Sequence, residues 1–266
     1  MMPTTVSTVV VSTVVVSTVS VPTVCVSFVV PAHNEERLLP GALQAIRSAA
    51  DSCKIKYEIV VADDASTDRT AQIATEFGAR VVAVQHRKIS ATRNSGARAA
   101  LGDLIVFVDA DTLINASVLG RAIEAITDGA VGGGAMVRFD GRIPLYARAS
   151  IPVLTGLMRV LRLAAGCFVF CTRAAFDAAG GFDERLFGAE EIAFSAALKK
   201  VGRFVILRET VMSSGRKLRT YSGFEVLAIM GRFAMGGRKM IERRDQMGLW
   251  YDPRREDPER TNSPLS

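Results

Sequence analysis

The chain has 266 residues, 49% hydrophobic and 23% charged, which excludes a wholly disordered protein and fits one sizeable domain or two small ones. Its four cysteines and two histidines are too few for a disulfide scaffold or a multi-histidine metal site, so we interpret the cysteines as reduced thiols of a reducing compartment. The net charge of +6 is uneven, because residues 1–198 carry −1 and residues 199–266 carry +7. Such a basic region binds phosphates, an anionic membrane surface or nucleic acid, or is only a solvated face.

The N-terminal segment differs from the rest in composition. Residues 1–34 contain no charged side chain, and ten of the first 24 residues are Ser or Thr, most of them within repeats of Val-Ser-Thr-Val-Val. No basic residues precede the apolar run, as they would in a signal peptide. We therefore interpret residues 1–23 as a disordered low-complexity extension, with a divergent membrane anchor as the alternative.

From residue 24 onward, short β-branched runs alternate with amphipathic stretches. Strands and helices that alternate at this spacing form βαβ units, so we expect an α/β fold with a mainly parallel sheet flanked by helices. The periodicity predicts strands over 24–30, 58–62, 80–84 and 104–108, and helices over 36–50, 70–77, 90–101 and 116–127.

The second half of the chain is less regular. It is predicted to contain strands over 130–138, 167–171 and 204–207, and helices over 143–164 and 190–201. Basic amphipathic helices and a polar tail are expected beyond residue 221. No apolar stretch after residue 24 approaches the roughly 20 residues that a membrane span needs, so we expect this part of the chain to be soluble.

Two carboxylates follow the strand predicted over 104–108. Asp109 and Asp111 are two positions apart in an extended segment, so their side chains point to the same side. That arrangement suits a hard divalent cation shared with phosphates. The alternative is that Asp111 or Thr112 caps the following helix.

A second acidic pair, Asp63 and Asp64, follows the second predicted strand, and Glu35 follows the first. Ligands of open α/β sheets bind outside the carboxyl ends of the strands, so we expect these residues to share one edge with Asp109. Asp63 and Asp64 are placed to hydrogen-bond the base and ribose of a nucleotide, or only to cap the next helix.

Taken in order, these motifs resemble those of family 2 glycosyltransferases, which have the GT-A fold. The nucleotide-sugar half is carried by VSFVVPAHNEE, EIVVADDASTDRT and ATRNSGARAALGDLIVFVDADT, and the acceptor half by FCTRAAFDAAGGFDERLFGAEEIAFSAALKKVG. The resemblance covers roughly residues 24–208. It implies a domain over 24–220, divided into a nucleotide-sugar half (24–128) and an acceptor half (129–220), followed by a basic region over 221–266.

The resemblance implies a nucleoside site at the first two strands. Pro31, Ala32 and Glu35 would border the nucleoside. Asp63 or Asp64 would contact the base, which is most often uracil in this family. A UDP-sugar is therefore the favoured donor, and a GDP-sugar is possible.

The resemblance also implies a diphosphate and metal site. Arg93 would approach the base or the diphosphate, unless it is a surface charge of its helix. Asp109-Ala110-Asp111 would be the DxD element, with Asp111 as the metal ligand and Asp109, beside Ala110, binding ribose or metal. The metal would be Mg²⁺ or Mn²⁺, acting as a Lewis acid on the departing diphosphate.

The catalytic base of inverting relatives lies in a Gly-Glu-Asp motif, and here the sequence departs from that pattern. The matching stretch is Gly188-Ala189-Glu190-Glu191. Glu191 occupies the usual Asp position and is interpreted as the base, with Glu190 orienting it or binding the acceptor. Successive helical residues diverge by about 100°, so both are not expected to face one sugar.

The expected function is metal-dependent, inverting transfer of a sugar to a glycan or lipid-linked acceptor. The Gln-x-x-Arg-Trp element of processive relatives is absent, since the only tryptophan is Trp250, so transfer is expected to be non-processive. The alternative is a catalytically inactive protein that binds a nucleotide sugar or a membrane surface on the same fold.

Partners and location follow from the same features. Arg216, Lys217 and Arg219 form either a basic lid over the diphosphate or a solvated turn. The basic helices beyond residue 221 either lie on an anionic membrane or pack on the domain. We expect a cytoplasmic protein, with peripheral contact to the inner face of the membrane as one possibility, and no nucleic-acid partner, because no reading module is recognisable.

Overall fold

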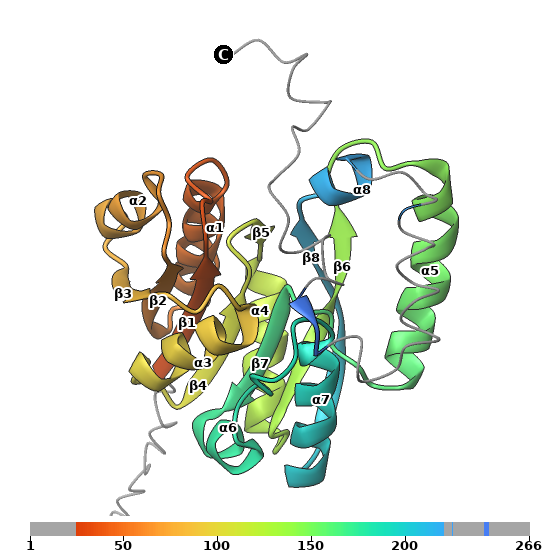
Figure 1. Cartoon of the computed structure of the whole chain (residues 1–266). Helices are drawn as coiled ribbons and strands as arrows, with labels where there is room; N and C mark the ends of the chain where they lie inside the picture. Colours follow the sequence, from red (N-terminus) through yellow and green to blue (C-terminus); the bar gives the residue numbers. More distant parts are fainter. Residues whose placement is uncertain (1–24, 221–224, 226–241, 245–266) are drawn as a thin grey trace, which may run out of the picture.

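The computed structural model describes residues 25–220, 225 and 242–244 (Figure 1). The expectations for residues 1–23, and those for most of 221–266, lie outside these described residues. The strands are β1 (Cys25–Ala32), β2 (Lys56–Asp64), β3 (Arg80–Val84), β4 (Leu104–Val108), β5 (Thr112–Leu113), β6 (Gly132–Phe139), β7 (Phe168–Thr172) and β8 (Phe204–Ser213). The helices are α1 (Leu39–Ser52), α2 (Thr70–Glu76), α3 (Ile89–Ala99), α4 (Ala116–Thr127), α5 (Leu145–Val160), α6 (Arg173–Ala179), α7 (Glu190–Val201) and α8 (Arg216–Thr220).

All eight of these strands form one sheet in the order β3-β2-β1-β4-β7-β6-β8-β5. The pairs among β3, β2, β1 and β4 are parallel, as is β6 with β8. The expected mainly parallel sheet is confirmed, and its antiparallel members are β7, which runs antiparallel to both of its neighbours, and β5, which runs antiparallel to β8. In the register of β1 with β2, Ala32 lies opposite Asp63, so the two strands end level with each other.

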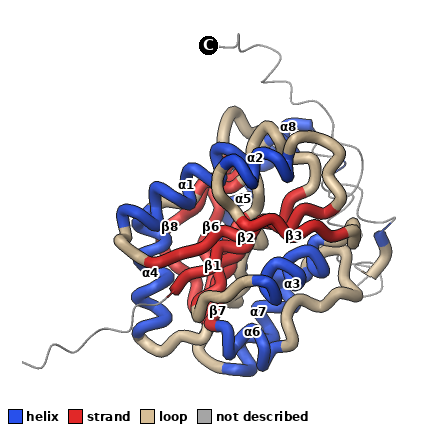
Figure 2. Tube along the Cα trace, turned by 90° about the vertical axis from the view of Figure 1, so that its left-hand side faces the viewer, coloured by secondary structure: helices blue, strands red, loops and turns tan. Residues whose placement is uncertain are grey.

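Helices cover both faces of the sheet (Figure 2). On one face, the core packs α1, α2 and α4 against the sheet through residues such as Leu43, Ile73 and Leu119. On the other face, α3, α6 and α7 pack around Phe107, whose ring centroid lies 4.9 Å from that of Phe182. Buried side chains of this size contribute most of the hydrophobic stabilisation, at about 1.5–3 kcal/mol each before entropy is subtracted.

Most predicted elements are confirmed, and some with the same bounds, such as the strands over 80–84 and 104–108 and the helices over 116–127 and 190–201. The prediction that the last strand ends at residue 207 is wrong, since β8 continues to Ser213. Its polar stretch around Arg208 and Glu209 broke the apolar pattern, yet β8 keeps pairing with β6 across an irregularity between Gly134 and Met136. Neither β5 nor α6 was expected.

The four cysteines are free thiols, as expected. Burial raises the pKa of the Cys167 and Cys171 thiols above its ordinary value, so neither is a reactive thiolate near neutral pH. Across the described ranges, no helix combines the length and the apolar character that crossing a bilayer requires.

Candidate active site

The polar residues expected at one edge of the sheet do converge there. β1, β2 and β4 are parallel neighbours, so Ala32, Asp63 and Asp109 lie at or directly after the carboxyl ends of adjacent strands. β8, from the second half of the chain, reaches the same edge, because Ser213 pairs with Thr112 directly after the DxD segment. Segments from the two halves of the chain thus meet at this edge of the sheet (Figure 1).

Arg93 lies at the centre of this site. Its guanidinium is buried and donates to Glu190 Oε1 at 2.9 Å, to Asp109 Oδ1 at 2.8 Å and to the carbonyl of Gly166 at 3.0 Å. Burial alone would lower the pKa of Arg93, but Asp109 and Glu190 raise it above its ordinary value. The alternative that Arg93 is a surface charge is therefore wrong, and its contacts make it the link between the DxD element and α7.

Glu190 and Glu191 begin α7 but have different surroundings. Glu190 is buried and paired with Arg93, whereas the half-buried Glu191 has no ion pair among the described residues. Burial and the neighbouring Glu190 raise the pKa of Glu191 to about 8, although Arg93 opposes them. A β-carbon on Gly166 would lie 3.3 Å from Cδ of Glu191, so glycine leaves room for this carboxyl beside Arg93.

Asp63 and Asp64 are both buried, and only one of them has spare bonding capacity. The carboxylate of Asp64 accepts the backbone N–H groups of residues 86, 87 and 88 and the hydroxyl of Thr92, at 2.7–3.1 Å. Oδ1 of Asp63 is buried without any hydrogen-bond partner. Because buried polar atoms are nearly always satisfied, Asp63 is the one placed to receive a ligand donor.

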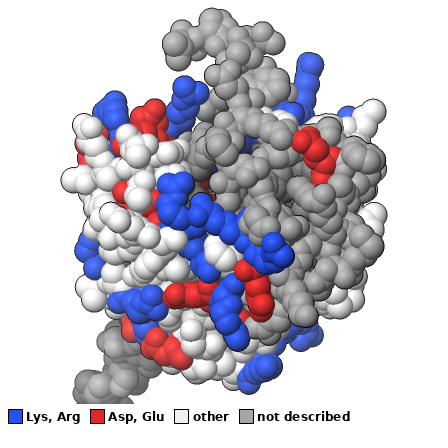
Figure 3. Space-filling model, viewed as in Figure 1, with Lys and Arg blue, Asp and Glu red and all other residues white. Residues whose placement is uncertain are grey.

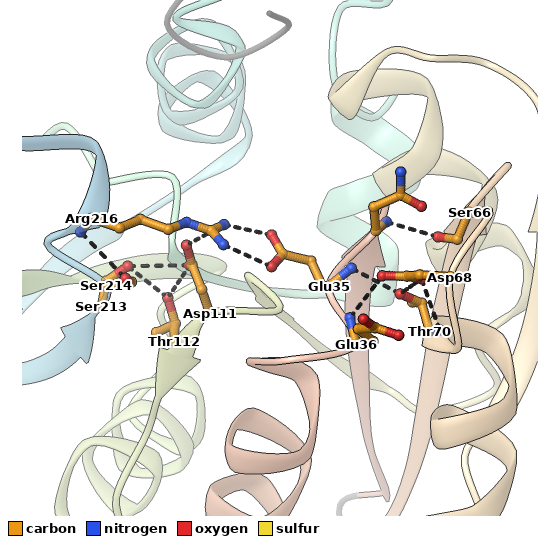
Figure 4. A network of polar contacts seen from close by, with 11 residues as sticks. Glu35, Glu36, Ser66, Asp68, Thr70, Asp111, Thr112, Ser213, Ser214 and Arg216 are labelled. Carbon is orange, nitrogen blue, oxygen red and sulfur yellow. Dashed lines mark hydrogen bonds and ion pairs between the residues drawn. The ribbon is translucent and has the colours of Figure 1, made fainter. Parts of the chain in front are cut away.

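Arg216 joins the two halves at the DxD element (Figure 4). Its guanidinium makes two hydrogen bonds to the carboxylate of Glu35, at 2.7 and 3.1 Å, and a third to Asp111 Oδ2 at 3.2 Å. Oδ1 of Asp111 accepts the hydroxyl of Ser213 at 3.3 Å. Of the two alternatives for this basic segment, the solvated turn is wrong for Arg216, whose side chain is 18% exposed.

The DxD segment does not cap α4. Asn115 has that role, because its side-chain oxygen accepts the N–H of Val118 at 2.9 Å. The alternative that Asp111 or Thr112 caps the helix is therefore wrong. The signal for the true cap was present, since asparagine directly before a helical pattern is a favoured N-cap.

Asn94 is a site residue that sequence reasoning missed. Its side-chain amide donates to the carbonyl of Phe182 and accepts the N–H of Phe182, both at 2.9 Å. The ring of Phe182 in turn lies 5.3 Å from the guanidinium carbon of Arg93. Asn94 thus holds the loop before α7 against α3. In the sequence, the only signal for this role was its position directly after Arg93.

The chemistry of the DxD carboxylates fits Mg²⁺ or Mn²⁺ in part. Both offer the hard oxygen donors that these cations take, and the side chain of Asp109 is 34% exposed with only one oxygen bound to Arg93. No three metal-ligating side chains converge within the described residues. A cation here would therefore depend on oxygens from a bound diphosphate.

Comparison with known proteins is consistent with this geometry. A family model described as "Glycosyl transferase family 2" matches residues 27–178. An undecaprenyl-phosphate 4-deoxy-4-formamido-L-arabinose transferase of Edwardsiella ictaluri is 35% identical over 147 residues, which are 50% of this chain and 43% of the relative. A 4,4'-diaponeurosporenoate glycosyltransferase of Staphylococcus haemolyticus is 35% identical over 38% of this chain and 27% of its own. The matched part is thus less than half the length of either relative.

Solved structures share the fold. TarS of S. aureus covers 85% of this chain and 69% of its own, with 20% identity and a TM-score of 0.58. The mannosyltransferase PcManGT of Pyrobaculum calidifontis, solved with GDP-Man and Mn²⁺, covers 80% of this chain and 64% of its own, with 21% identity and a TM-score of 0.60. The expected α/β GT-A fold and the family resemblance are confirmed.

Proposed function

The chain belongs to glycosyl transferase family 2, and we propose that it moves a sugar from a nucleoside-diphosphate donor to an acceptor hydroxyl. The observation that supports this most directly is the Arg93 link. One buried guanidinium binds both Asp109 of the DxD element and Glu190 at the start of α7. A donor diphosphate at Asp109 and an acceptor at α7 would thereby be held in fixed positions relative to each other.

We propose that the nucleoside binds between the ends of β1 and β2, beside Pro31, Ala32 and Asp63. The unpartnered Oδ1 of Asp63 would accept an N–H of the base, as uracil and guanine both offer. A UDP-sugar is favoured and a GDP-sugar is possible. Structures with the same fold have been solved with UDP and with GDP-Man, so this fold takes either base.

Asp63→Asn is expected to weaken UDP binding about 10- to 100-fold in calorimetry, because a charge-assisted hydrogen bond to the base is lost. Its thermal stability should be unchanged or higher, since Oδ1 has no protein partner to lose. Asp64→Asn is the matched variant. It should instead lower the melting temperature, because an amide keeps one acceptor oxygen, whereas both carboxylate oxygens of Asp64 accept donors from residues 86–88 and Thr92. Equal weakening by both variants would contradict the assignment of the base to Asp63.

We propose that Asp111 and Asp109, with Ala110 between them, hold a divalent metal together with the donor diphosphate. Mg²⁺ or Mn²⁺ would neutralise the departing diphosphate and act as a Lewis acid. Arg216 donates to Oδ2 of Asp111, so a cation at Asp111 would compete with that guanidinium.

Asp111→Asn is expected to reduce the Mn²⁺-dependent part of UDP binding by more than about tenfold, because a neutral amide is a poor ligand for a hard cation. Calorimetry with and without Mn²⁺ measures this difference. Asp177→Asn, at an exposed carboxylate of α6, is the control with the same charge change and should bind as the unmodified chain does. UDP binding that is the same with and without Mn²⁺ would exclude the metal site.

We propose that Glu191 deprotonates the acceptor hydroxyl as the hydroxyl attacks the anomeric carbon. The nucleoside diphosphate would leave from the opposite face, so a single displacement inverts the anomeric configuration. Glu190 is neutralised by Arg93, which favours an orienting role for it. One sugar is expected per encounter, since the Gln-x-x-Arg-Trp element of processive relatives is absent from the sequence.

The acceptor is proposed to be a glycan or a lipid-linked molecule reached by peripheral contact with the inner face of the membrane. The names of the undecaprenyl-phosphate transferases among the relatives favour a lipid-linked acceptor. The two acceptor classes are separated by measuring the release of nucleoside diphosphate, once with a polyprenyl phosphate and once with a soluble oligosaccharide as the acceptor. Metal-dependent donor binding without turnover on any acceptor would favour the inactive binding protein instead.

A further inference from the structure

We propose that the outer face of α5 docks on an anionic lipid bilayer, with the helix lying in the plane of the interface. The outer face consists of Leu145, Val153, Leu157 and Val160, whose exposed fractions are 78%, 74%, 54% and 80%. Their spacing of eight, four and three positions places them on one side of a helix. The opposite side faces the domain, since Ala147 is buried and Met158 is half-buried.

A group of exposed apolar side chains of this size marks an interaction site on a protein surface. Leu154 and Leu161 extend the outer face along one flank, and both are more than two-fifths exposed. No charged residue interrupts the outer face. A helix with such a stripe inserts it into the boundary between headgroups and acyl chains when basic residues flank the stripe.

Basic residues flank the outer face, and three of them have no acidic partner within the described part of the chain. Residues 141–176 contain no Asp or Glu, while the part from 142 to 162 contains four arginines. Within the described residues, Arg148, Arg159 and Arg162 take part in no ion pair. The polar bond that Arg159 makes goes to a backbone carbonyl, that of Leu207 at 3.2 Å.

Two more basic residues, Lys199 and Arg203, lie near the C-terminal end of α5. Arg159, Arg162 and Arg203 line a hollow of about 300 Å³ whose apolar wall is formed by residues 204–206. Arg203 donates to the carbonyl of Asp128 at 2.8 Å, and Lys199 donates to the carbonyl of Leu161 at 3.0 Å. Guanidinium groups that hold only carbonyl oxygens keep their charge for an anion, and lipid phosphates supply anions beside an apolar phase.

The face around α3 has a different pattern of charge. Figure 3 shows basic and acidic side chains next to one another there. They include the pairs Arg98–Glu184 and Arg185–Asp183, at 3.4 and 2.7 Å. Charges that neutralise each other in this way do not attract a lipid surface, which distinguishes the face around α3 from the outer face of α5.

α5 is also connected to the candidate active site. The hydroxyl of Tyr146 donates to the carbonyl of Leu218 in α8 at 3.2 Å, and α8 begins with Arg216, which binds Asp111. A bilayer against α5 would therefore adjoin the site. The inference deepens the peripheral membrane contact of the proposed function, but the docking itself needs no turnover.

The test is co-sedimentation of the full chain with vesicles of phosphatidylcholine, with and without phosphatidylglycerol. We expect binding that requires phosphatidylglycerol and weakens at high salt. The double variant Leu157→Asp, Val160→Asp should lower vesicle affinity by more than about tenfold, because two charges would enter the apolar boundary. Leu101→Asp is the matched control, since Leu101 is 81% exposed between α3 and β4, and it should bind as the unmodified chain does.

The basic residues are tested in the same way. Arg148→Glu with Arg162→Glu should abolish the preference for phosphatidylglycerol. Lys54→Glu with Lys56→Glu makes the same change of charge at exposed residues near the start of β2. This control should keep the preference for phosphatidylglycerol. Nucleotide binding by each variant, measured by calorimetry, reports whether the domain is folded and tests the proposed function separately from vesicle binding.

Several results would overturn the inference. One is the absence of vesicle binding, and another is equal loss in the α5 variants and their controls. A lower melting temperature of Leu157→Asp, Val160→Asp without vesicles, with unchanged vesicle affinity, would show that another segment of the chain covers the face. A change from dimer to monomer in light scattering would show that a second copy covers it.

Discussion

Arg93→Leu is expected to lower the free energy of unfolding by about 3–5 kcal/mol, because it leaves the buried carboxylate of Glu190 without its partner. Glu190 would lose its ion pair, and Asp109 would lose the hydrogen bond to its Oδ1. The carbonyl of Gly166 would also lose a donor. Urea denaturation followed by circular dichroism measures the change.

Arg98→Leu is the matched control on the same helix. Arg98 is largely exposed and pairs with Glu184 at 3.4 Å, so its loss should cost at most about 1 kcal/mol. Arg93→Lys should lie between the two, because one ammonium group cannot reproduce the planar fork that binds three acceptors. Similar costs for Arg93→Leu and Arg98→Leu would show that the buried cluster contributes little to folding.

Glu191→Gln is expected to lower the rate of nucleoside diphosphate release in the presence of an acceptor by about 10²–10⁴, the range for loss of a general base. Donor binding should be unchanged, because the proposed nucleoside and metal residues lie on β1, β2 and the DxD segment. Calorimetry of UDP binding separates these two effects. If Glu190→Gln abolished turnover while Glu191→Gln remained active, the proposed roles of the two glutamates would be reversed.

The raised pKa of Glu191 also predicts a dependence of stability on pH. Its carboxyl has a pKa of about 8 in the folded protein, above its ordinary value, so between that value and about 8 the folded state binds more protons than the unfolded state. The free energy of unfolding should therefore fall as pH rises through this window. Glu191→Gln should show a shallower fall in thermal melts, and an unchanged slope would contradict the raised pKa of Glu191.

The sequence by itself determined most of the secondary structure and the edge of the sheet at which the polar residues meet. Apolar runs such as the one over 104–108 are buried strands because five consecutive apolar side chains need burial on both faces. Polar residues directly after such strands then meet at one edge, because the strands are parallel neighbours. Asp63 and Asp109 were predicted together for that reason, from local pattern alone.

Only the tertiary structure decided what each of these side chains contacts. Arg93 and Glu190 are 97 positions apart, and no local pattern shows that one guanidinium neutralises that carboxylate. The same holds for Arg216, which reaches Glu35 across 181 positions. Asp63 and Asp64 look equivalent in the sequence, yet Asp64 is saturated by the segment over 86–88 while Asp63 keeps an unpartnered oxygen. Local propensity and periodicity depend on neighbours along the chain, whereas ion pairs and pKa shifts depend on which distant residues folding brings within a few ångströms.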